Sequence, residues 1–289
     1  MSSGARPRAA HRRRRLLAAL VVIALLGVGV TEARRHWRGD VETGAAAAHR
    51  AQIERYTVRS RFVRRTLPQV AATPRGEPSQ SKRPLLVFLH GSGDDGEESN
   101  ANGAFFQALD RLGARAPVVV FPNGGESSYF HRRGDGDWAR YVLDEVIPQA
   151  IRRTGADPDR VAIGGISMGG FGAYNLARLR PRRFCAVGGH SAALWQSGGE
   201  LAPGAFDDAA DFARNDVIAI ARSRGRGAWG SARLWLDGGT KDPFRAGGDA
   251  LAAALGIRMR HWEGEHEGDY WRAHFDRYLR FYADALEAC

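Results

Sequence analysis

The chain of 289 residues is 44% hydrophobic, so it can bury a sizeable core, and we expect one large α/β domain with a tail. Its formal net charge is +10, but residues 1–40 hold nine arginines against one glutamate and one aspartate, which accounts for +7 of this. The remaining body carries about +3, too little for a strong face that binds nucleic-acid phosphates, so a nucleic-acid partner is not expected.

The first 33 residues predict export across a membrane. Arginines at 12–15 precede fifteen apolar residues at 16–30, a pattern typical of an export signal. As a helix, this stretch would span about 22 Å, short of the hydrocarbon core of about 30 Å. A signal peptide ending at Ala33 is favoured. An uncleaved anchor that contacts the membrane stays open, because helix tilt and bilayer thinning absorb the mismatch. Residues 34–55 are interpreted as a linker and 56–289 as the folded domain.

The body alternates short apolar runs with longer amphipathic segments, which is typical of βαβ units and a mostly parallel sheet flanked by helices. One or two edge strands are expected within 55–68. The apolar runs that predict further strands are 85–89, 118–121, 161–163, 185–188, 233–236 and 257–262. The predicted helices are 103–113, 139–153, 169–180, 246–255 and 270–287. Residues 196–230 break the rhythm and predict a small insertion.

The two cysteines are expected to be free thiols. Cys185 lies in the apolar sequence FCAVGG, which predicts a core strand, and Cys289 is the last residue printed. A disulfide between them would require the tail to reach a buried strand. The sequence also lacks paired cysteine and histidine spacings for zinc, so neither a metal nor a cofactor is expected.

Ser167 is the candidate nucleophile. It stands in GGISMGGFGAY, directly after an apolar run and before a predicted helix, which is the setting of a strand-to-helix nucleophile elbow. Glycines at 165 and 169 suit such a turn, because a Cβ two residues before or after the serine would clash. The helix that begins behind Ser167 offers free N–H groups for an oxyanion. A glycine-rich loop without chemistry is the alternative.

A second glycine-rich turn supplies the other half of an anion site. In LVFLHGSGDD, the residues from His90 to Gly93 follow an apolar strand, where the second oxyanion N–H of such a site arises. We expect the backbone N–H groups of Ser92 and Met168 to form this oxyanion hole. His90 precedes the nucleophile and is interpreted as a residue that anchors the loop.

The acid and the base are expected after later strands. RLWLDGGTKDPF offers Asp237, which ends a strand and braces the turn, and Asp242, which lies out on the loop and is preferred. IRMRHWEGEHEGDYW offers His261 within a strand and His266 before the last helix, and His266 is preferred. The order Ser167, Asp242, His266 is that of the α/β hydrolases, with the histidine as base and the aspartate orienting it.

From about residue 56 to 287 the chain resembles the α/β-hydrolase serine esterases. The resemblance is to the group that includes esterase D (S-formylglutathione hydrolase), feruloyl-esterase-like enzymes and mycolyltransferases. It rests on LLVFLHGSG, VLDEVIPQAI, DRVAIGGISMGGFGAYNLA, LDGGTKDPF and WEGEHEGDYW. It implies an α/β-hydrolase fold, with Ser167 as nucleophile, Asp242 as acid and His266 as base. Esterase D proteins usually lack the leader found here, so glutathione-ester detoxification is not expected.

Three further residues are candidates for the substrate pocket. His190 in GGHSAALW stands where the group often has a plain turn, so it could line the pocket, with a satisfied loop histidine as the alternative. Trp138 and Tyr129 lie before or at the start of a predicted helix and could shape the acyl or leaving-group pocket. Packing in the core is the alternative for both aromatic residues.

Together these residues predict an exported serine hydrolase that cleaves carboxylic esters through an acyl-enzyme. The expected partner is a small-molecule or envelope ester. An acyltransferase that moves the acyl group to a sugar or lipid acceptor is one alternative. A non-catalytic envelope binding protein of the same fold is another, although such a protein would not need all three triad residues. The sequence does not fix the acyl chain length or the oligomeric state.

Overall fold

The computed structural model describes residues 51–93 and 99–289. The predicted leader at 1–33 and the first part of the predicted linker, 34–50, lie outside the described residues. Within these two ranges, no helix is both long and apolar enough to cross a bilayer.

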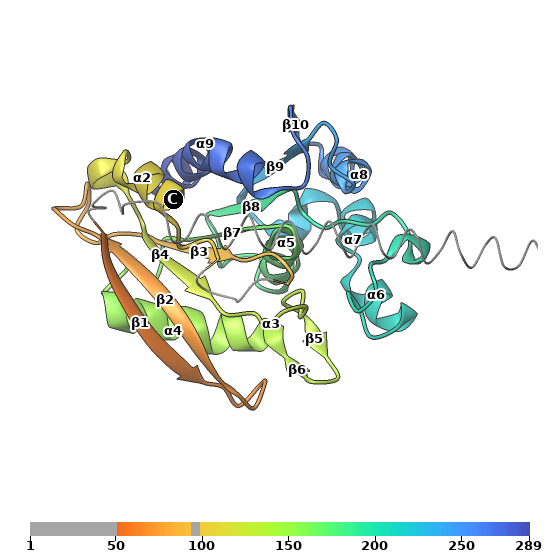
Figure 1. Ribbon diagram of the computed structural model, residues 1–289, viewed down its shortest axis with the longest axis horizontal. Coiled ribbons are helices and arrows are strands. Elements are labelled where there is room, and N and C mark those ends of the chain that lie inside the picture. Colours follow the sequence, from red (N-terminus) through yellow and green to blue (C-terminus); the bar gives the residue numbers. More distant parts are fainter. Residues whose placement is uncertain (1–50, 94–98) are drawn as a thin grey trace, which may run out of the picture. The chain divides into compact units, whose positions relative to one another are not determined.

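An eight-stranded sheet forms the centre of the described domain (Figure 1). Its strands are β1 (Ala51–Arg59), β2 (Thr66–Pro74), β3 (Leu85–Leu89), β4 (Val118–Pro122), β7 (Val161–Ile166), β8 (Ala186–His190), β9 (Arg233–Gly239) and β10 (Met259–Trp262). Their spatial order is β1-β2-β4-β3-β7-β8-β9-β10, and every neighbouring pair from β4 to β10 is parallel. The prediction of a mostly parallel sheet is confirmed. The carboxyl ends of β3, β7, β9 and β10 therefore meet at one edge.

The antiparallel part of the sheet starts earlier than the sequence predicts. β1 pairs with β2, and β2 pairs with β4, both antiparallel. β1 begins at Ala51, so residues 51–55 belong to the sheet and the predicted domain boundary at 56 is too late. Ala51 is buried and Gln52 exposed, but Ile53 and Glu54 are both half-buried. The start of the strand therefore lacks the clean alternation that would mark it.

Helices cover both faces of the sheet, with α2 and α9 on one side and α4 on the other (Figure 1). Those of the described residues are α2 (Gly103–Asp110), α3 (Trp138–Arg140), α4 (Ile147–Thr154), α5 (Met168–Leu179), α6 (Ala209–Asn215), α7 (Val217–Arg224), α8 (Arg245–Leu255) and α9 (Gly268–Glu287). A π-helical turn, Tyr141–Val146, joins α3 to α4. Along β3, Leu85 and Val87 face the core shared with α5, whereas Leu86 and Phe88 face the core shared with α2 and α9. This is the two-residue period of a strand buried on both faces.

The predicted insertion at 196–230 contains α6 and α7 and is tied to a distant loop. The carboxylate of Asp211 in α6 lies 3.0 Å from His131 Nε2, and both side chains are 1% exposed. Arg133 and Asp207 form a second ion pair at 2.9 Å between the same segments. The insertion is thus fixed against residues 131–133, which follow the candidate pocket residue Tyr129.

Cys185 and Cys289 form a disulfide, with their Cα atoms 5.8 Å apart, so the expectation of free thiols is wrong. The 20 residues of α9 form a helix about 30 Å long. This helix packs on β7 and β8 and returns the chain to the segment that precedes β8. The crosslink joins residues 104 apart in sequence, and closing a loop of this size stabilises the fold by about 4 kcal/mol.

Candidate active site

Ser167 lies on the sharp turn between β7 and α5, where the sequence predicts it. Its backbone has φ 54° and ψ −114°, a conformation that costs a non-glycine residue about 1–3 kcal/mol. The Ser167 amide donates to the His190 carbonyl oxygen at 3.0 Å, which fixes the turn. A Cβ on Gly165 would lie 2.6 Å from the backbone of Gly169, and a Cβ on Gly169 would lie 2.4 Å from the Leu89 carbonyl oxygen. Only glycine fits at both positions.

His266 connects Ser167 to Asp242. Its Nε2 lies 2.9 Å from Ser167 Oγ, and its Nδ1 lies 3.2 and 3.3 Å from the two carboxylate oxygens of Asp242. The Asp242 side chain is 1% exposed and that of His266 is 21% exposed. The carboxylate is therefore shielded from water, while the imidazole stays within reach of a small molecule. The structure brings together the three residues that the sequence order singled out.

Two adjoining loops hold Asp242 and His266 beside each other. Asp242 follows β9 and His266 follows β10, which are parallel neighbours in the sheet. Beyond the strands, the Lys241 amide donates to the Gly264 carbonyl oxygen at 3.0 Å. A Cβ on Gly239 would lie 2.3 Å from that same oxygen, so glycine lets the loops approach this closely. Strand pairing thus continues into the loops and sets the separation of the two side chains.

The surroundings of Asp242 favour its ionised form. Burial acts to raise the pKa of this carboxyl, but the hydrogen bond and charge of His266 and a hydrogen bond from the Phe244 amide, at 2.8 Å, act more strongly and lower it. A charged Asp242 accepts from His266 Nδ1, which leaves Nε2 free to accept the Ser167 proton.

The two predicted anion-binding amides belong to elements that pack on each other. Met168 is the first residue of α5, and Ser92 lies in the turn after β3. A Cβ on Gly169 would lie 2.7 Å from the His90 carbonyl oxygen, so α5 begins directly against the chain that leads to Ser92. The positive end of the α5 dipole adds to this arrangement. The place suits an oxygen that gains negative charge.

His90 anchors the turn that carries Ser92. Its Nε2 accepts a hydrogen bond from the Gly124 amide at 2.8 Å, and its Nδ1 donates to the Gly91 carbonyl oxygen at 2.7 Å. Burial lowers the pKa of His90 to about 4, although the bond to Gly91 acts in the opposite direction. The neutral imidazole therefore joins the turn after β3 to the loop after β4, as a loop-anchoring residue should.

Aromatic side chains extend from His266 towards Ser92. The Phe244 ring lies 5.0 Å from the His266 ring, and the Trp195 ring lies 5.4 Å from that of Phe244. Tyr129 lies behind these rings at 5.6 Å from Trp195, and its hydroxyl is hydrogen-bonded to the Ser92 side chain. Tyr129 is only 5% exposed and Trp195 6%, so both rings pack in the core behind the half-buried Phe244. Tyr129, predicted as a possible pocket residue, therefore fits the alternative of core packing, and neither Trp195 nor Phe244 was predicted. Trp195 is the last residue of GGHSAALW and Phe244 is the last residue of LDGGTKDPF, and both segments were considered for other residues.

His190 does not line the pocket, so this prediction is wrong. Its side chain is fully buried beneath α9, where Nδ1 donates to Asp237 at 2.7 Å and Nε2 accepts from the Tyr282 hydroxyl at 2.8 Å. The ring also stacks on Tyr278 with a centroid separation of 3.6 Å. Asp237 accepts further hydrogen bonds from the hydroxyls of Tyr270 and Tyr278, at 3.1 and 2.9 Å. Asp237 and His190 are thus structural residues.

Trp138 is a core residue as well, and the prediction that it shapes the pocket is not supported. It is 2% exposed, and its ring lies 6.0 Å from that of Tyr141. A Cβ on Gly125 would lie 2.9 Å from the indole, so Trp138 packs beneath the loop after β4. His261 is structural too, because its Nε2 lies 2.8 Å from Asp249 in α8.

No set of ligands for a metal ion is found in the part of the chain that the structure describes. Across 51–93 and 99–289, no three histidine, cysteine, aspartate or glutamate side chains are placed to hold one.

The comparison with known proteins covers the part of the chain that contains the candidate active site. A family model described as "Putative esterase" matches residues 63–282, which include Ser167, Asp242 and His266. The chain belongs to this family. Two curated esterases of Mycobacterium tuberculosis are each 30% identical to the family member described here, over 121 residues or 37% of its chain. The chain spans only about a quarter (25%) of the length of these relatives.

Solved structures establish the fold of this esterase-family chain. A ferulic acid esterase superposes with a TM-score of 0.72 at 21% identity, covering 82% of this chain and 99% of the other. An S-formylglutathione hydrolase from Agrobacterium tumefaciens superposes with a TM-score of 0.68 at 18% identity, covering 83% and 97%. The predicted α/β-hydrolase fold and the resemblance to the esterase group are confirmed.

Proposed function

We propose that the protein is an exported serine carboxylesterase that works through Ser167, His266 and Asp242. The observation that carries this proposal is the hydrogen-bond chain in which His266 Nε2 lies 2.9 Å from Ser167 Oγ and Nδ1 faces Asp242. These three residues lie at the edge of the sheet where the carboxyl ends of the strands meet. The protein also belongs to an esterase family. The strained backbone of Ser167 supports the assignment, because such strain clusters at active sites.

In the proposed reaction, Ser167 Oγ attacks the ester carbonyl carbon while His266 Nε2 takes the hydroxyl proton. The carbonyl oxygen becomes an oxyanion and is bound by the N–H groups of Ser92 and Met168. His266 then gives its proton to the leaving alcohol, and an acyl-enzyme remains. A water molecule, deprotonated by His266, attacks the acyl carbon, the bond from this carbon to Ser167 Oγ breaks, and His266 returns the proton to Oγ as the acid leaves. Asp242 holds the imidazole and stabilises its charged form throughout.

The proposed substrate is an ester with a flat or apolar group beside the scissile bond. The support is the half-buried Phe244 ring, which lies 5.0 Å from the His266 ring and is backed by the buried rings of Trp195 and Tyr129. An aromatic surface beside the reacting serine can pack against an apolar group or a ring. One structural neighbour is named a ferulic acid esterase, and ferulic acid is an aromatic acid.

Two independent features support export. Residues 12–30 have the basic and then apolar pattern of an export signal. The disulfide between Cys185 and Cys289 is of a kind that forms and persists in oxidising compartments outside the cytosol. Whether the leader is cleaved or retained as an anchor is decided by the mass of the mature protein.

The test is labelling with an alkyl fluorophosphonate together with turnover of p-nitrophenyl esters of aromatic and aliphatic acids. The wild-type chain should be labelled and should turn over esters, and Ser167→Ala should lose both while keeping its melting temperature. Added alcohol acceptors distinguish the alternatives, since an acyltransferase would form new ester faster than free acid. A folded wild-type protein with neither labelling nor turnover would contradict the proposal and favour the binding protein.

A further inference from the structure

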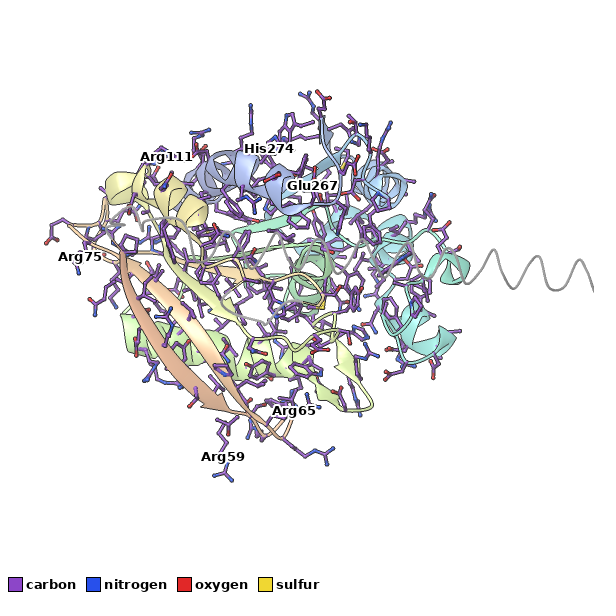
Figure 2. The ribbon with its side chains drawn as sticks, viewed as in Figure 1. Arg59, Arg65, Arg75, Arg111, Glu267 and His274 are labelled. Atoms are coloured by element: carbon purple, nitrogen blue, oxygen red, sulfur yellow. A yellow bond between two sulfur atoms is a disulfide. The ribbon has the colours of Figure 1, made fainter. Side chains whose placement is uncertain are left out.

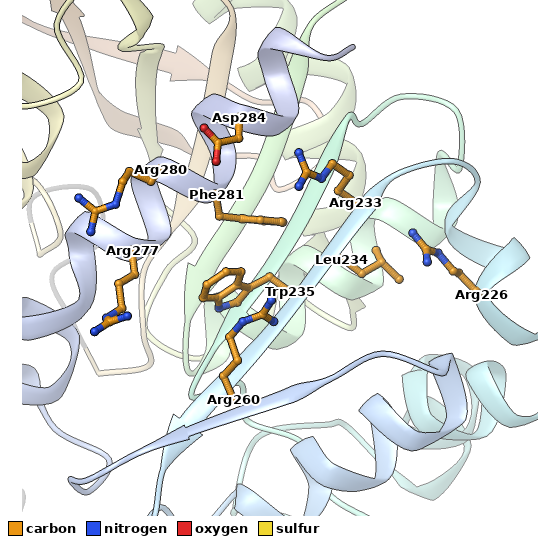
Figure 3. A pocket seen from close by; sticks show the side chains of 9 residues that line it. All are labelled: Arg226, Arg233, Leu234, Trp235, Arg260, Arg277, Arg280, Phe281 and Asp284. Atoms are coloured by element: carbon orange, nitrogen blue, oxygen red, sulfur yellow. The ribbon is translucent and has the colours of Figure 1, made fainter.

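A pocket with five arginines lies at the far end of β9 from the active site. It has a volume of about 440 Å³, within the range of small-molecule sites. Its lining residues are Arg226, Arg233, Leu234, Trp235, Arg260, Arg277, Arg280, Phe281 and Asp284 (Figure 3). Arg233 begins β9, whereas Asp242 follows the end of this strand, so the strand's length of about 20 Å separates the two sites.

The arginines reach the pocket from four elements. Arg226 comes from the short helical turn Gly225–Trp229, Arg233 from β9, and Arg260 from β10. Arg277 and Arg280 come from α9 at the opposite rim of the pocket, where the Arg277 guanidinium lies 5.2 Å from the centre of the Trp262 ring (Figure 3). Convergence from separate parts of the sequence sets this pocket apart from a run of charge along one helix.

Few carboxylates oppose the positive charge of the pocket. Asp284 is its one lining carboxylate, and it is already paired with Arg115, which also pairs with Glu287. Among the described residues, Arg233 and Arg280 form no ion pair. The small net charge of the body, about +3, hides this cluster because carboxylates elsewhere balance it.

The floor of the pocket is fixed in place. The Arg260 guanidinium lies over the Trp235 ring at 3.6 Å from its centroid, which orients its N–H groups. The Trp235 Nε1 donates to the buried Asp237 carboxylate at 2.6 Å, so the indole is held at its other edge. The Phe281 ring packs against Trp235 at 5.0 Å. Burial, followed by the neighbouring Arg258, lowers the pKa of Arg260, although the charge of Asp237 acts in the opposite direction.

We propose that this pocket binds a phosphate group of a small molecule or of a phospholipid headgroup. Guanidinium groups present N–H forks that match phosphate oxygens, and several of them around one hollow favour a ligand with concentrated negative charge. A phosphate supplies about two such charges in a small volume, with three acceptor oxygens. The apolar floor of Trp235 and Phe281 suits the organic part next to the phosphate. A single hollow of this size does not follow an extended nucleic-acid backbone.

The test uses pyrophosphate as the soluble probe and vesicles as the lipid probe, with the full-length chain. Calorimetric titration measures pyrophosphate binding. Flotation compares vesicles of phosphatidylcholine alone with vesicles that also contain phosphatidylglycerol. The variant Arg233→Gln, Arg277→Gln, Arg280→Gln removes three exposed pocket arginines without touching Trp235 or Asp237.

A matched control removes three exposed arginines elsewhere. Arg59 ends β1, Arg75 follows β2 and Arg152 lies on α4 (Figure 2 labels the first two), and each is changed to glutamine. Both triple variants lower the net charge equally. Melting temperatures establish that all three proteins are folded.

The expected result is saturable pyrophosphate binding that the pocket variant weakens by about tenfold or more, while the control stays close to wild type. Binding that appears only with phosphatidylglycerol vesicles, and that the pocket variant alone weakens, identifies the headgroup as the source of the phosphate. Equal losses in the pocket and control variants would show general charge attraction and overturn the proposal. Absence of binding to both probes would overturn it too. Ester turnover is measured separately and does not enter this result.

Discussion

Two aspartate–histidine–hydroxyl chains lie close together in this protein, and only one is accessible. In the first, Asp242 and His266 lead to the Ser167 hydroxyl, and the His266 side chain is 21% exposed. In the second, Asp237 and His190 lead to the hydroxyl of Tyr282, and neither His190 nor Asp237 has any exposed side-chain surface.

The difference lies in what surrounds the histidine. His190 is enclosed by a stacked Tyr278 ring and by α9, and the hydroxyl that it meets is a phenol. Burial, and then the charge of Asp237, raises the pKa of Tyr282 well above its ordinary value, so this group stays neutral and inert. His266 meets a serine on a strained turn at the strand ends. An aspartate–histidine pair therefore becomes an active-site candidate only where the imidazole is partly exposed and its second ring nitrogen faces a nucleophile.

The largest expected effect separates the two histidines. His266→Gln should lower kcat by about 10⁴-fold or more, because the general base of the proposed reaction is lost, with little change in stability. His190→Gln should leave the kcat of the folded protein within a few-fold while lowering the free energy of unfolding by about 2–3 kcal/mol. Initial rates and denaturant melts on both variants check this, and a large kcat loss in a stable His190→Gln would contradict the comparison.

The two aspartates should differ in the same way, Asp242 in its effect on kcat and Asp237 in its effect on stability. Asp242→Asn should lower kcat by about 10³–10⁴-fold, since the amide no longer fixes the imidazole tautomer. Asp237→Asn should instead lower the free energy of unfolding by about 3–5 kcal/mol, because His190 and the tyrosines lose a charged acceptor. The same rate and melting measurements apply. If Asp237→Asn kept full stability, its network would be less important than the burial implies.

The disulfide should affect stability only. Cys289→Ser removes the bond to Cys185 and should lower the free energy of unfolding by about 3–4 kcal/mol through the freed loop. The crosslink lies at the end of α9, away from the triad, so kcat at low temperature should stay near wild type. Treatment of the wild type with a reductant should reproduce the shift, and a reductant effect in Cys289→Ser would show that another process is responsible.

The pH dependence of stability should sharpen the role of the third histidine, His90. Burial lowers its folded pKa to about 4, while the unfolded side chain titrates near 6.5. Between these values the unfolded state binds more protons, so stability falls as the pH falls, by about 2–3 kcal/mol at pH 4. His90→Gln keeps an acceptor for the Gly124 amide but does not titrate. Its unfolding free energy should fall less steeply over this range, and an unchanged slope would rule out His90 as the source.

The sequence predicted the triad because each residue follows a strand and carries a local pattern. Gly165 and Gly169 around Ser167 reflect close backbone contacts that any chain with this turn must meet. Ser167, Asp242 and His266 each follow a strand of the parallel part of the sheet. They were expected to lie close together, because parallel strands bring their carboxyl ends to one edge.

Two things could not be predicted in this way: the face of a strand on which a side chain lies, and the contacts between residues far apart in sequence. His190 follows the same kind of strand end, but the alternation along β8 turns it beneath α9, and no local pattern records which face is open. The disulfide was missed because its feasibility depends on the length and direction of α9 relative to β8. The arginine pocket was hidden for a similar reason, since its members are scattered between residues 226 and 280.

The disulfide between Cys185 and Cys289 also determines whether a single proteolytic cut separates the chain into two fragments. The closed loop of the chain contains Asp242 and His266, whereas Ser167 lies before it. A single cut at any exposed site within the loop would leave two pieces joined by the disulfide, with every member of the triad still in one covalent particle. Such a nicked protein would migrate as a single species on a non-reducing gel and as two on a reducing gel.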